Sequence, residues 1–288
     1  MNLIRLSLVA VALVVSGGLV AAPTVAADDA ARTSLGFRMA SLNLKHTLTP
    51  AEVAHDVRSV LRRARPSVIG FQERRSTHRA LRAALPRHWA LRMPGGRPSR
   101  SHNPIAFDKR VWKHHHSWPQ ALATKTWRRS SGRVAVDQYG VVAVLEHRAT
   151  GHRVRAISFH MPPSIHDKRS GGPNWRLRDR VETFWRMAAA VRRVARSTPG
   201  GTQFVALCDC NVHFGRDRTR HLVRGHLTGP LRLDSNYTAG RRPRAGWQID
   251  YVMAARTRAF RIVGGWSLHG LRTDHPVVVA RFGRGARQ

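Results

Sequence analysis

Apolar runs closed by polar residues recur along the chain from residue 36 onward. The clearest run covers residues 204–207 and continues through Cys208 to Asp209, with Asn211 two places later. A short apolar run bounded by polar residues is typical of a buried β-strand. Comparable runs predict further strands at residues 36–44, 67–71, 139–147, 153–160, 247–253, 259–268 and 276–282, with weaker ones near 88–92, 103–107 and 110–116.

Helices are indicated by caps and by apolar residues at helical spacing. Thr49 and Glu52 stand three residues apart, as in a capping box, and Pro66 marks the end of the helix that they begin. A longer helix is expected at 177–195, where apolar residues recur every three or four positions, and a short one at 76–85. Strands and helices therefore alternate along the chain.

Three segments show little periodicity. Residues 161–175 are rich in proline and glycine, and residues 117–138 and 212–246 carry scattered aromatic and basic side chains. Such composition favours loops at the surface. We expect all three segments to be irregular.

The N-terminus has the features of a secretory signal peptide. A positive start at Arg5 precedes an apolar stretch, and small residues lead to a cleavage position after Ala26 or Ala27. A membrane anchor is the alternative, but the apolar stretch is short and no charged stop follows it. We therefore expect an exported, extracellular protein with a removed segment 1–27, a short tail 28–35 and a single domain 36–288.

The charge is strongly positive. Lys and Arg number 50 against 16 Asp and Glu, and the net charge is +34. Nearly all the basic residues are arginine, whose planar guanidinium matches phosphate geometry. This excess favours polyanionic partners such as nucleic acid, anionic lipid or polyphosphate. A general bias of the genome toward arginine would give the same composition.

The chain has two cysteines, Cys208 and Cys210, on either side of Asp209. If they lie two residues apart on an extended strand, a disulfide between them closes only a very small, strained ring. A zinc site would need further cysteine or histidine ligands, and no other cysteine exists. We expect the two cysteines to serve as small buried packing residues.

Polar residues gather where the predicted strands end. Each alone is explained as a cap, a turn or a surface charge, but so many in a chain with only 16 acidic residues suggest a site. Carboxylates suit a hard divalent cation, amides suit phosphate oxygens, and imidazoles suit developing negative charge. Together they indicate metal-assisted attack of water on a phosphoester. The residues are Asn43, Glu73, His160, Asp209, Asn211, Asp250, Asp274 and His275.

In this order and spacing, the set resembles the endonuclease/exonuclease/phosphatase superfamily, whose members include deoxyribonuclease I-like enzymes. The resemblance covers about residues 36–282. It implies an α/β fold: a four-layer sandwich of two mixed β-sheets packed face to face, with helices on the outside. Where most members have Gly-Asp-Phe-Asn, this chain has Cys208-Asp209-Cys210-Asn211. That departure puts the local packing in question more than the reaction.

The resemblance also implies a metal site. Glu73 would be the principal ligand, with Asn43 and Asp274 close to the ion. The expected cofactor is Mg²⁺, with Mn²⁺ or Ca²⁺ as alternatives.

Catalytic roles follow from the same resemblance. Asp209 would orient and deprotonate the attacking water, and Asn211 would hold the phosphate. His160 would contact a non-bridging or leaving oxygen. His275 would stabilise the transition state or protonate the leaving group, with its imidazole oriented by Asp250.

The substrate is a separate question, because one fold serves many phosphoesters. Nucleic acid, DNA or RNA, is favoured by the arginine excess and by Lys168, Arg169 and Trp175 in the loop after the seventh predicted strand. Trp118 and Trp127 are candidates for the apolar surface of a phospholipid phosphodiesterase. A small-phosphoester phosphatase and a non-catalytic nucleic-acid-binding protein are further alternatives. We expect a monomer with no obligate protein partner.

Overall fold

The structure is a computed structural model that describes residues 36–73, 78–94, 102–129, 132–167, 169–217, 221–239, 249–257 and 260–284. The chain divides into two units, Met1–Ser34 and Leu35–Gln288, and every described residue belongs to the second. The predicted signal peptide and tail therefore lie outside the described residues. Within the described residues, no helix is long and apolar enough to cross a membrane.

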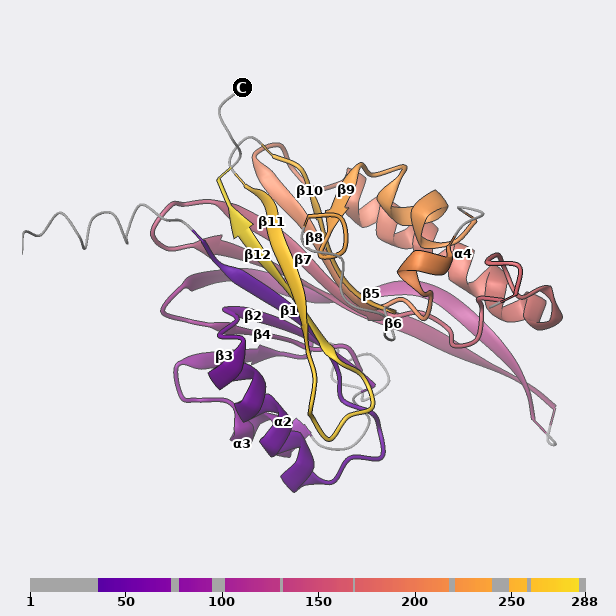
Figure 1. The fold of residues 1–288 in the computed structure, drawn as a ribbon, viewed down its shortest axis with the longest axis horizontal. Helices are drawn as coiled ribbons and strands as arrows, with labels where there is room; N and C mark the ends of the chain where they lie inside the picture. The colour runs from indigo at the N-terminus through magenta and orange to yellow at the C-terminus, as the bar shows by residue number, and fades with distance from the viewer. Residues whose placement is uncertain are drawn as a thin grey trace, which may run out of the picture. The chain divides into compact units, whose positions relative to one another are not determined.

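The first sheet has six strands in the order β11-β12-β1-β2-β4-β3. β1 runs parallel to β2, while β12 pairs with β1 in the antiparallel sense, so the sheet is mixed. In this sheet a strand from early in the described chain, β1, pairs with the last strand, β12 (Figure 1). Its strands are β1 (Arg38–Asn43), β2 (Val68–Gln72), β3 (Trp89–Arg92), β4 (Ile105–Asp108), β11 (Arg261–Leu268) and β12 (Val277–Gly283).

The second sheet is built from the middle of the chain and has the order β5-β6-β7-β8-β10-β9. It is also mixed, because β7 and β8 are parallel while β10 pairs with β8 in the antiparallel sense. Its strands are β5 (Trp112–Arg129), β6 (Gly132–His147), β7 (Arg153–His160), β8 (Thr202–Asp209), β9 (Leu233–Ser235) and β10 (Asp250–Ala255).

Helices cover the outer faces of the two sheets (Figure 1). α2 (Pro50–Arg63) begins with the predicted capping box and buries Val53, Val57 and Val60 in the same core as β1 and β2. α3 (His78–Ala84) packs beside it. On the opposite side, α4 (Arg178–Arg196) buries its apolar face in the core of the second sheet. The short turns η2 (Trp175–Leu177), η3 (Phe214–Arg216) and η4 (Arg224–Thr228) complete this side. The predicted four-layer α/β sandwich is confirmed.

The two sheets approach closely where β2 crosses β8. A Cβ atom added to Gly70 would lie 2.6 Å from Cβ of Leu207, so only glycine fits without movement. Next to this contact, buried Gln72 donates from Nε2 to Oγ of Ser158 at 3.3 Å and accepts from Oγ of Ser41 at 3.3 Å. The sheets are therefore joined by apolar packing and by satisfied hydrogen bonds, which fixes one against the other.

Two of the expected surface loops contain regular structure. Residues 117–138 lie largely in the long β5–β6 hairpin, which pairs from Trp112–His147 to Arg129–Gly132. Its register shifts between His114 and His116 and again between Ala121 and Ala123. Each shift inserts a residue and breaks the two-residue alternation, so the pattern no longer indicates a strand. In 212–246, the turns η3 and η4 and the strand β9 are formed, while residues 241–248 lie outside the described part.

Candidate active site

Strand pairing brings the predicted site residues to one edge of the sandwich. In the first sheet Asn43 pairs in register with Gln72, directly before Glu73. In the second sheet the parallel strands β7 and β8 end together at His160 and Asp209, and the antiparallel β10 starts opposite Asp209 with Asp250. Polar residues that follow separate apolar runs therefore meet, as the sequence predicts.

Asp209 is at the centre of this arrangement and is almost fully buried. Its Oδ2 accepts a hydrogen bond from Nδ2 of Asn43 at 2.8 Å and lies 3.3 Å from Nε2 of His160 and 3.7 Å from Nδ1 of His275. Its Oδ1 accepts from the backbone N–H of Asn211 at 2.9 Å. Asp209 thus links the two sheets through Asn43.

Glu73 lies just beyond β2 with a positive φ of 59°, which turns the chain at the sheet edge. Its Oε1 accepts from Nδ2 of Asn43 at 3.2 Å, and its Oε2 lies 3.0 Å from Nδ1 of His46. Burial alone would raise the pKa of Glu73, but hydrogen bonds from His46 and Asn43 and the charge of His160 lower that pKa to about 2. Glu73 is therefore an anion at neutral pH.

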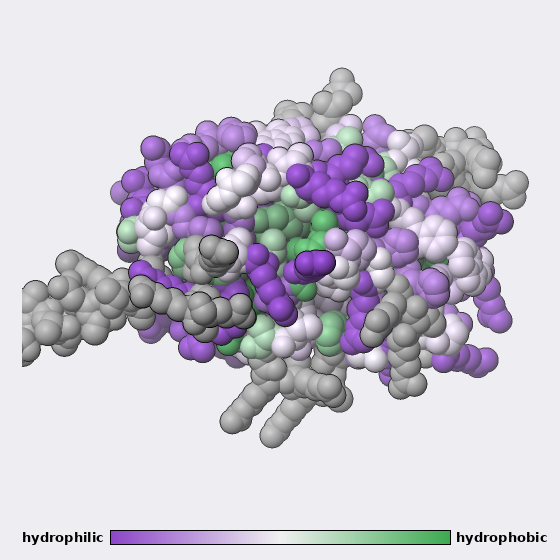
Figure 2. All heavy atoms as spheres, turned by 90° about the horizontal axis from the view of Figure 1, so that it is seen from above, coloured by the Kyte–Doolittle hydropathy of each residue, from purple (hydrophilic) through white to green (hydrophobic). Residues whose placement is uncertain are grey.

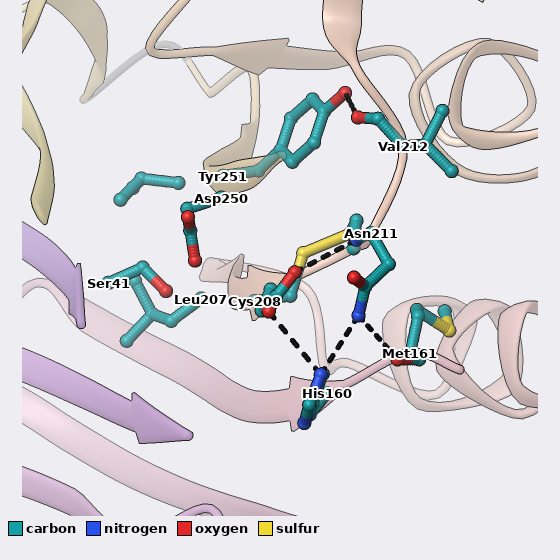
Figure 3. Close-up of a disulfide and its surroundings, with 12 residues drawn as sticks. Ser41, His160, Met161, Leu207, Cys208, Asn211, Val212, Asp250 and Tyr251 are labelled. Carbon is teal, nitrogen blue, oxygen red and sulfur yellow. Dashed lines mark hydrogen bonds and ion pairs between the residues drawn. A yellow bond between two sulfur atoms is a disulfide. The ribbon is translucent and has the colours of Figure 1, made fainter. Parts of the chain in front are cut away.

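His160 and Asn211 face each other (Figure 3), and His160 also lies next to Asp209. Nδ2 of Asn211 lies 2.9 Å from Nε2 of His160 and donates to the backbone oxygen of Met161 at 2.9 Å. Asn211 adopts a positive φ of 52°, so its side chain turns back toward the strand end that carries His160. An amide and an imidazole are therefore held side by side at the rim of the site.

Buried Asp250 pairs with His275, which is partly buried. Nδ1 of His275 lies 2.9 Å from Oδ2 of Asp250. Burial, and then the charge of Asp209, raise the pKa of Asp250 well above its usual range. For His275 burial acts to lower the pKa, but the hydrogen bond and charge of Asp250 outweigh it, and with the charges of Asp209 and Asp274 they raise the pKa to about 9. Nδ1 is engaged with Asp250, so Nε2 is the nitrogen left for a substrate.

The segment before His275 is fixed by Asp56, a residue that sequence reasoning missed. This fully buried carboxylate on α2 accepts the backbone N–H groups of Arg272 at 2.8 Å and Thr273 at 2.9 Å. Thr273 in turn donates from Oγ1 to the backbone oxygen of Asn43 at 2.8 Å. The sequence does contain a signal, since Asp56 interrupts the apolar stripe of its helix.

Asp274 stands apart from the other predicted metal residues. Its side chain is 54% exposed, and Oδ2 lies 3.0 Å from Nζ of Lys45. Among the described residues, the groups whose ligand atoms lie within 4.8 Å of one another are Glu73 with His160 and Asp209, and Asp209 with Asp250 and His275. Asp274 belongs to neither group.

Comparison with protein-family models finds no match, and no curated protein matches the chain in sequence. Solved structures do match. An endonuclease/exonuclease/phosphatase from Bacteroides vulgatus aligns over 87% of this chain and 99% of its own, with a TM-score of 0.65 and 17% identity. The chain has the endonuclease/exonuclease/phosphatase fold. The fold predicted by the resemblance is thereby confirmed.

Other structures with the endonuclease/exonuclease/phosphatase fold act on different molecules. D. rerio TDP2, in complex with a single-strand DNA product, aligns over 86% of this chain and 99% of its own at TM-score 0.61 and 12% identity. A mannosyl-6-phosphatase from Bacteroides thetaiotaomicron aligns over 85% and 99% at TM-score 0.61 and 14% identity. At 12–14% sequence identity this structural similarity establishes the fold but does not identify the substrate.

Cys208 and Cys210 form a disulfide, contrary to the prediction that they are separate packing residues. Their Cα atoms are 5.5 Å apart, whereas two residues of extended strand span roughly 6.6 Å. The prediction was wrong because it assumed an extended chain, and the chain bends at Asp209 where β8 ends. Both cysteines are fully buried, as expected.

The residues present fit the divalent cation that this fold implies. Glu73 and Asp209 offer carboxylate oxygens near each other, and the low pKa of Glu73 keeps it ionised. Magnesium prefers such oxygen ligands and usually keeps several waters, so two carboxylates suffice. Asn43 contributes differently from the expectation, because its Oδ1 accepts from the backbone N–H of Lys45 while its Nδ2 bridges the two carboxylates.

Proposed function

We propose that the protein is an exported, metal-dependent phosphoesterase that hydrolyses phosphodiester bonds of nucleic acid. One observation carries the proposal: carboxylates, an amide and two imidazoles from both sheets converge around Asp209 at a single edge of the sandwich. Carboxylates that bind a cation and activate water, beside donors that neutralise phosphate, are what phosphoester hydrolysis requires.

Glu73 would hold the cation, with the carboxylate of Asp209 beside it and Asn43 fixing both. Asp274, which pairs with Lys45, would act on the cation only through a bound water. Magnesium is the expected ion, and manganese and calcium are the alternatives. When bound, the cation would polarise a phosphate oxygen and offset the charge that develops there.

Asp209 would accept the proton of the attacking water. Its Oδ1 is held by the backbone N–H of Asn211, and its Oδ2 faces Asn43 and both histidines, so the carboxylate is fixed in one orientation. A fixed acceptor places the water without loss of orientation during the reaction.

His275 would act on the leaving oxygen. The raised pKa of His275 keeps the ring protonated at neutral pH, and Asp250 holds Nδ1 so that Nε2–H is presented to the substrate. His160 and Asn211, side by side, would contact the phosphate oxygens. Together these residues would supply the acid and the donors that balance Asp209 as the base.

Nucleic acid is supported by the arginine excess and by the fold shared with TDP2 in its complex with single-strand DNA. Among the described residues Trp175, which is 58% exposed, is the large apolar side chain most open to solvent, and it packs edge-on against Trp185. An exposed, supported indole suits stacking on a base. Figure 2 shows hydrophilic residues over most of one face, around a smaller apolar area near its centre.

Two other substrates are retained as alternatives. The fold shared with a mannosyl-6-phosphatase supports a small phosphoester, and exposed Trp175 would also suit a phospholipid surface. Of the earlier candidates for such a surface, Trp118 is partly buried, and the side chain of Trp127 lies outside the described residues. Export is supported by the disulfide, because disulfides persist in oxidising compartments.

The test uses purified protein that begins at Asp28 and supercoiled plasmid as substrate. We expect nicking that requires magnesium, stops with a chelator, and weakens steeply with salt because arginine–phosphate contacts release counterions. Asp209→Asn should abolish it. Asp108→Asn is the matched control, because Asp108 also ends a strand but lies at the opposite end of the first sheet, paired with Arg110.

An intact plasmid would contradict the nuclease assignment. The same protein would then be assayed with sphingomyelin vesicles and with sugar phosphates, and turnover that depends on Asp209 would identify the class. Turnover of any of them by the Asp209→Asn variant at the wild-type rate would refute the site itself.

A further inference from the structure

The disulfide lies behind the candidate catalytic carboxylate, on the other face of β8. Alternate residues of a strand point to opposite faces. Leu207 faces Gly70 of the other sheet and Asp209 faces Asn43, so Cys208 points away from the first sheet. The disulfide from Cys208 to Cys210 therefore links the strand end on its outer face, with Asp209 as the one residue between the two cysteines. Figure 3 shows the disulfide beside Asn211.

A second anchor on the same face holds the chain just beyond Asn211. Tyr251 pairs in register with Cys208 across β8 and β10, and both are fully buried. The hydroxyl of Tyr251 donates to the backbone oxygen of Val212 at 2.6 Å. Asn211 consequently lies between two fixed points, the disulfide at Cys210 and the tyrosine contact at Val212, as Figure 3 shows.

Between these anchors Asn211 has an unusual backbone conformation. A positive φ is uncommon for a residue other than glycine and persists where the surroundings impose it. Here φ is 52°, and it directs the backbone N–H to Oδ1 of Asp209 and the side-chain amide to Met161 and His160. Without the turn the amide would leave the site.

We propose that the Cys208–Cys210 disulfide, supported by Tyr251, positions Asp209 and Asn211 for the reaction. The expected effect on turnover rests on the proposed function, whereas the expected effect on the backbone of Asn211 does not. Removing the covalent link releases the bend at Asp209, so that Asn211 relaxes from its positive φ and its contacts lengthen. Glu73, the other carboxylate proposed to hold the cation, follows β2 of the first sheet and stays in place.

The kinetic test compares wild-type protein with Cys208→Ala/Cys210→Ala and Cys208→Ser/Cys210→Ser, each assayed at a temperature where it is fully folded. Displacing a positioned group by about 1 Å costs up to about 100-fold in rate. We expect kcat/KM to fall at least tenfold, with most of the loss in kcat, because Asp209 and Asn211 are displaced while Glu73 stays in place. A merely structural disulfide would lower the melting temperature and leave kcat of the folded protein unchanged.

Tyr251→Phe removes the hydroxyl and retains the ring, so it isolates the second anchor. We expect a smaller fall in kcat in the same direction. If both cysteine variants keep kcat within twofold of wild type, the positioning role is refuted, while the proposed function stands because the protein still cleaves its substrate.

A crystal structure of the Cys208→Ala/Cys210→Ala variant tests the inference without any substrate. We expect Asn211 to lose its positive φ. We also expect the distance between Nδ2 of Asn211 and Nε2 of His160, now 2.9 Å, to increase by more than 1 Å. An Asn211 that keeps its conformation in this variant overturns the proposal, whatever the protein hydrolyses.

Discussion

The pair of Asp250 and His275 gives the sharpest prediction, because one substitution removes the main cause of the raised pKa of His275. Asp250→Asn keeps the shape of the side chain and deletes its charge. The pKa of His275 in the wild type is raised to about 9 chiefly by the hydrogen bond and charge of Asp250. In the variant, burial of the ring opposes the remaining charges, so we expect its pKa to fall toward 6.5.

The size of the effect follows from the two pKa values. A change from 6.5 to about 9 corresponds to about 3 kcal/mol in favour of the protonated ring. A raised pKa means that this stabilisation is complete below pH 6.5 and is lost as the pH rises through 9. The raised pKa of Asp250 acts in the same direction, since ionising this buried carboxyl costs free energy. The stability of the wild type relative to Asp250→Asn should therefore decrease from pH 6 to pH 10.

The assay is an NMR titration of the His275 ring in metal-free protein, with urea unfolding of both proteins at each pH. Asp108→Asn is the control, because Asp108 also lies near a histidine, His88 at 3.7 Å, but away from the site. The reasoning is refuted if His275 of the wild type titrates near 6.5, or if the stability difference between wild type and Asp250→Asn is the same at every pH.

Two further predictions concern the frame of the site. Gly70→Ala should destabilise the protein by about 1–3 kcal/mol in urea unfolding, because the added Cβ would overlap Leu207. The control Gly264→Ala should be near neutral, because the nearest atoms are those of the flexible Arg281 side chain, 3.8 Å away. Equal effects of the two substitutions would contradict the close approach of the sheets. Asp56→Ala should cost about 3 kcal/mol and lower kcat, because it leaves the backbone N–H groups of Arg272 and buried Thr273 without their acceptor. An unchanged kcat would show that this segment is held by other contacts.

Local patterns predicted most of the frame of the site. Apolar runs marked the strands that end at Asn43, His160 and Asp209, and the capping box marked the start of α2 at Pro50. Parallel pairing then required the ends of neighbouring strands to meet. The site could be assembled because each of its main residues directly follows or begins a buried strand.

Features set by tertiary contact could not be predicted in this way. The disulfide depends on a bend at Asp209 that no local pattern records, and the β5–β6 hairpin is concealed by two register shifts. Asp56 contacts residues more than two hundred positions away, so only the folded chain shows its partner. The pairing of Asp274 with Lys45 likewise follows from the meeting of two distant loops.

The pairing of β1 with β12 has a consequence for synthesis of the protein. The partners of β1 in β12 are residues 278–281, close to the end of the chain. During translation the strand that carries Asn43 cannot pair with β12 until residues 278–281 have been made, and the contact of Thr273 with Asn43, which places His275, forms equally late. A chain released early would lack the partner of its first strand together with this histidine. Hydrolysis would therefore require synthesis through at least residue 281.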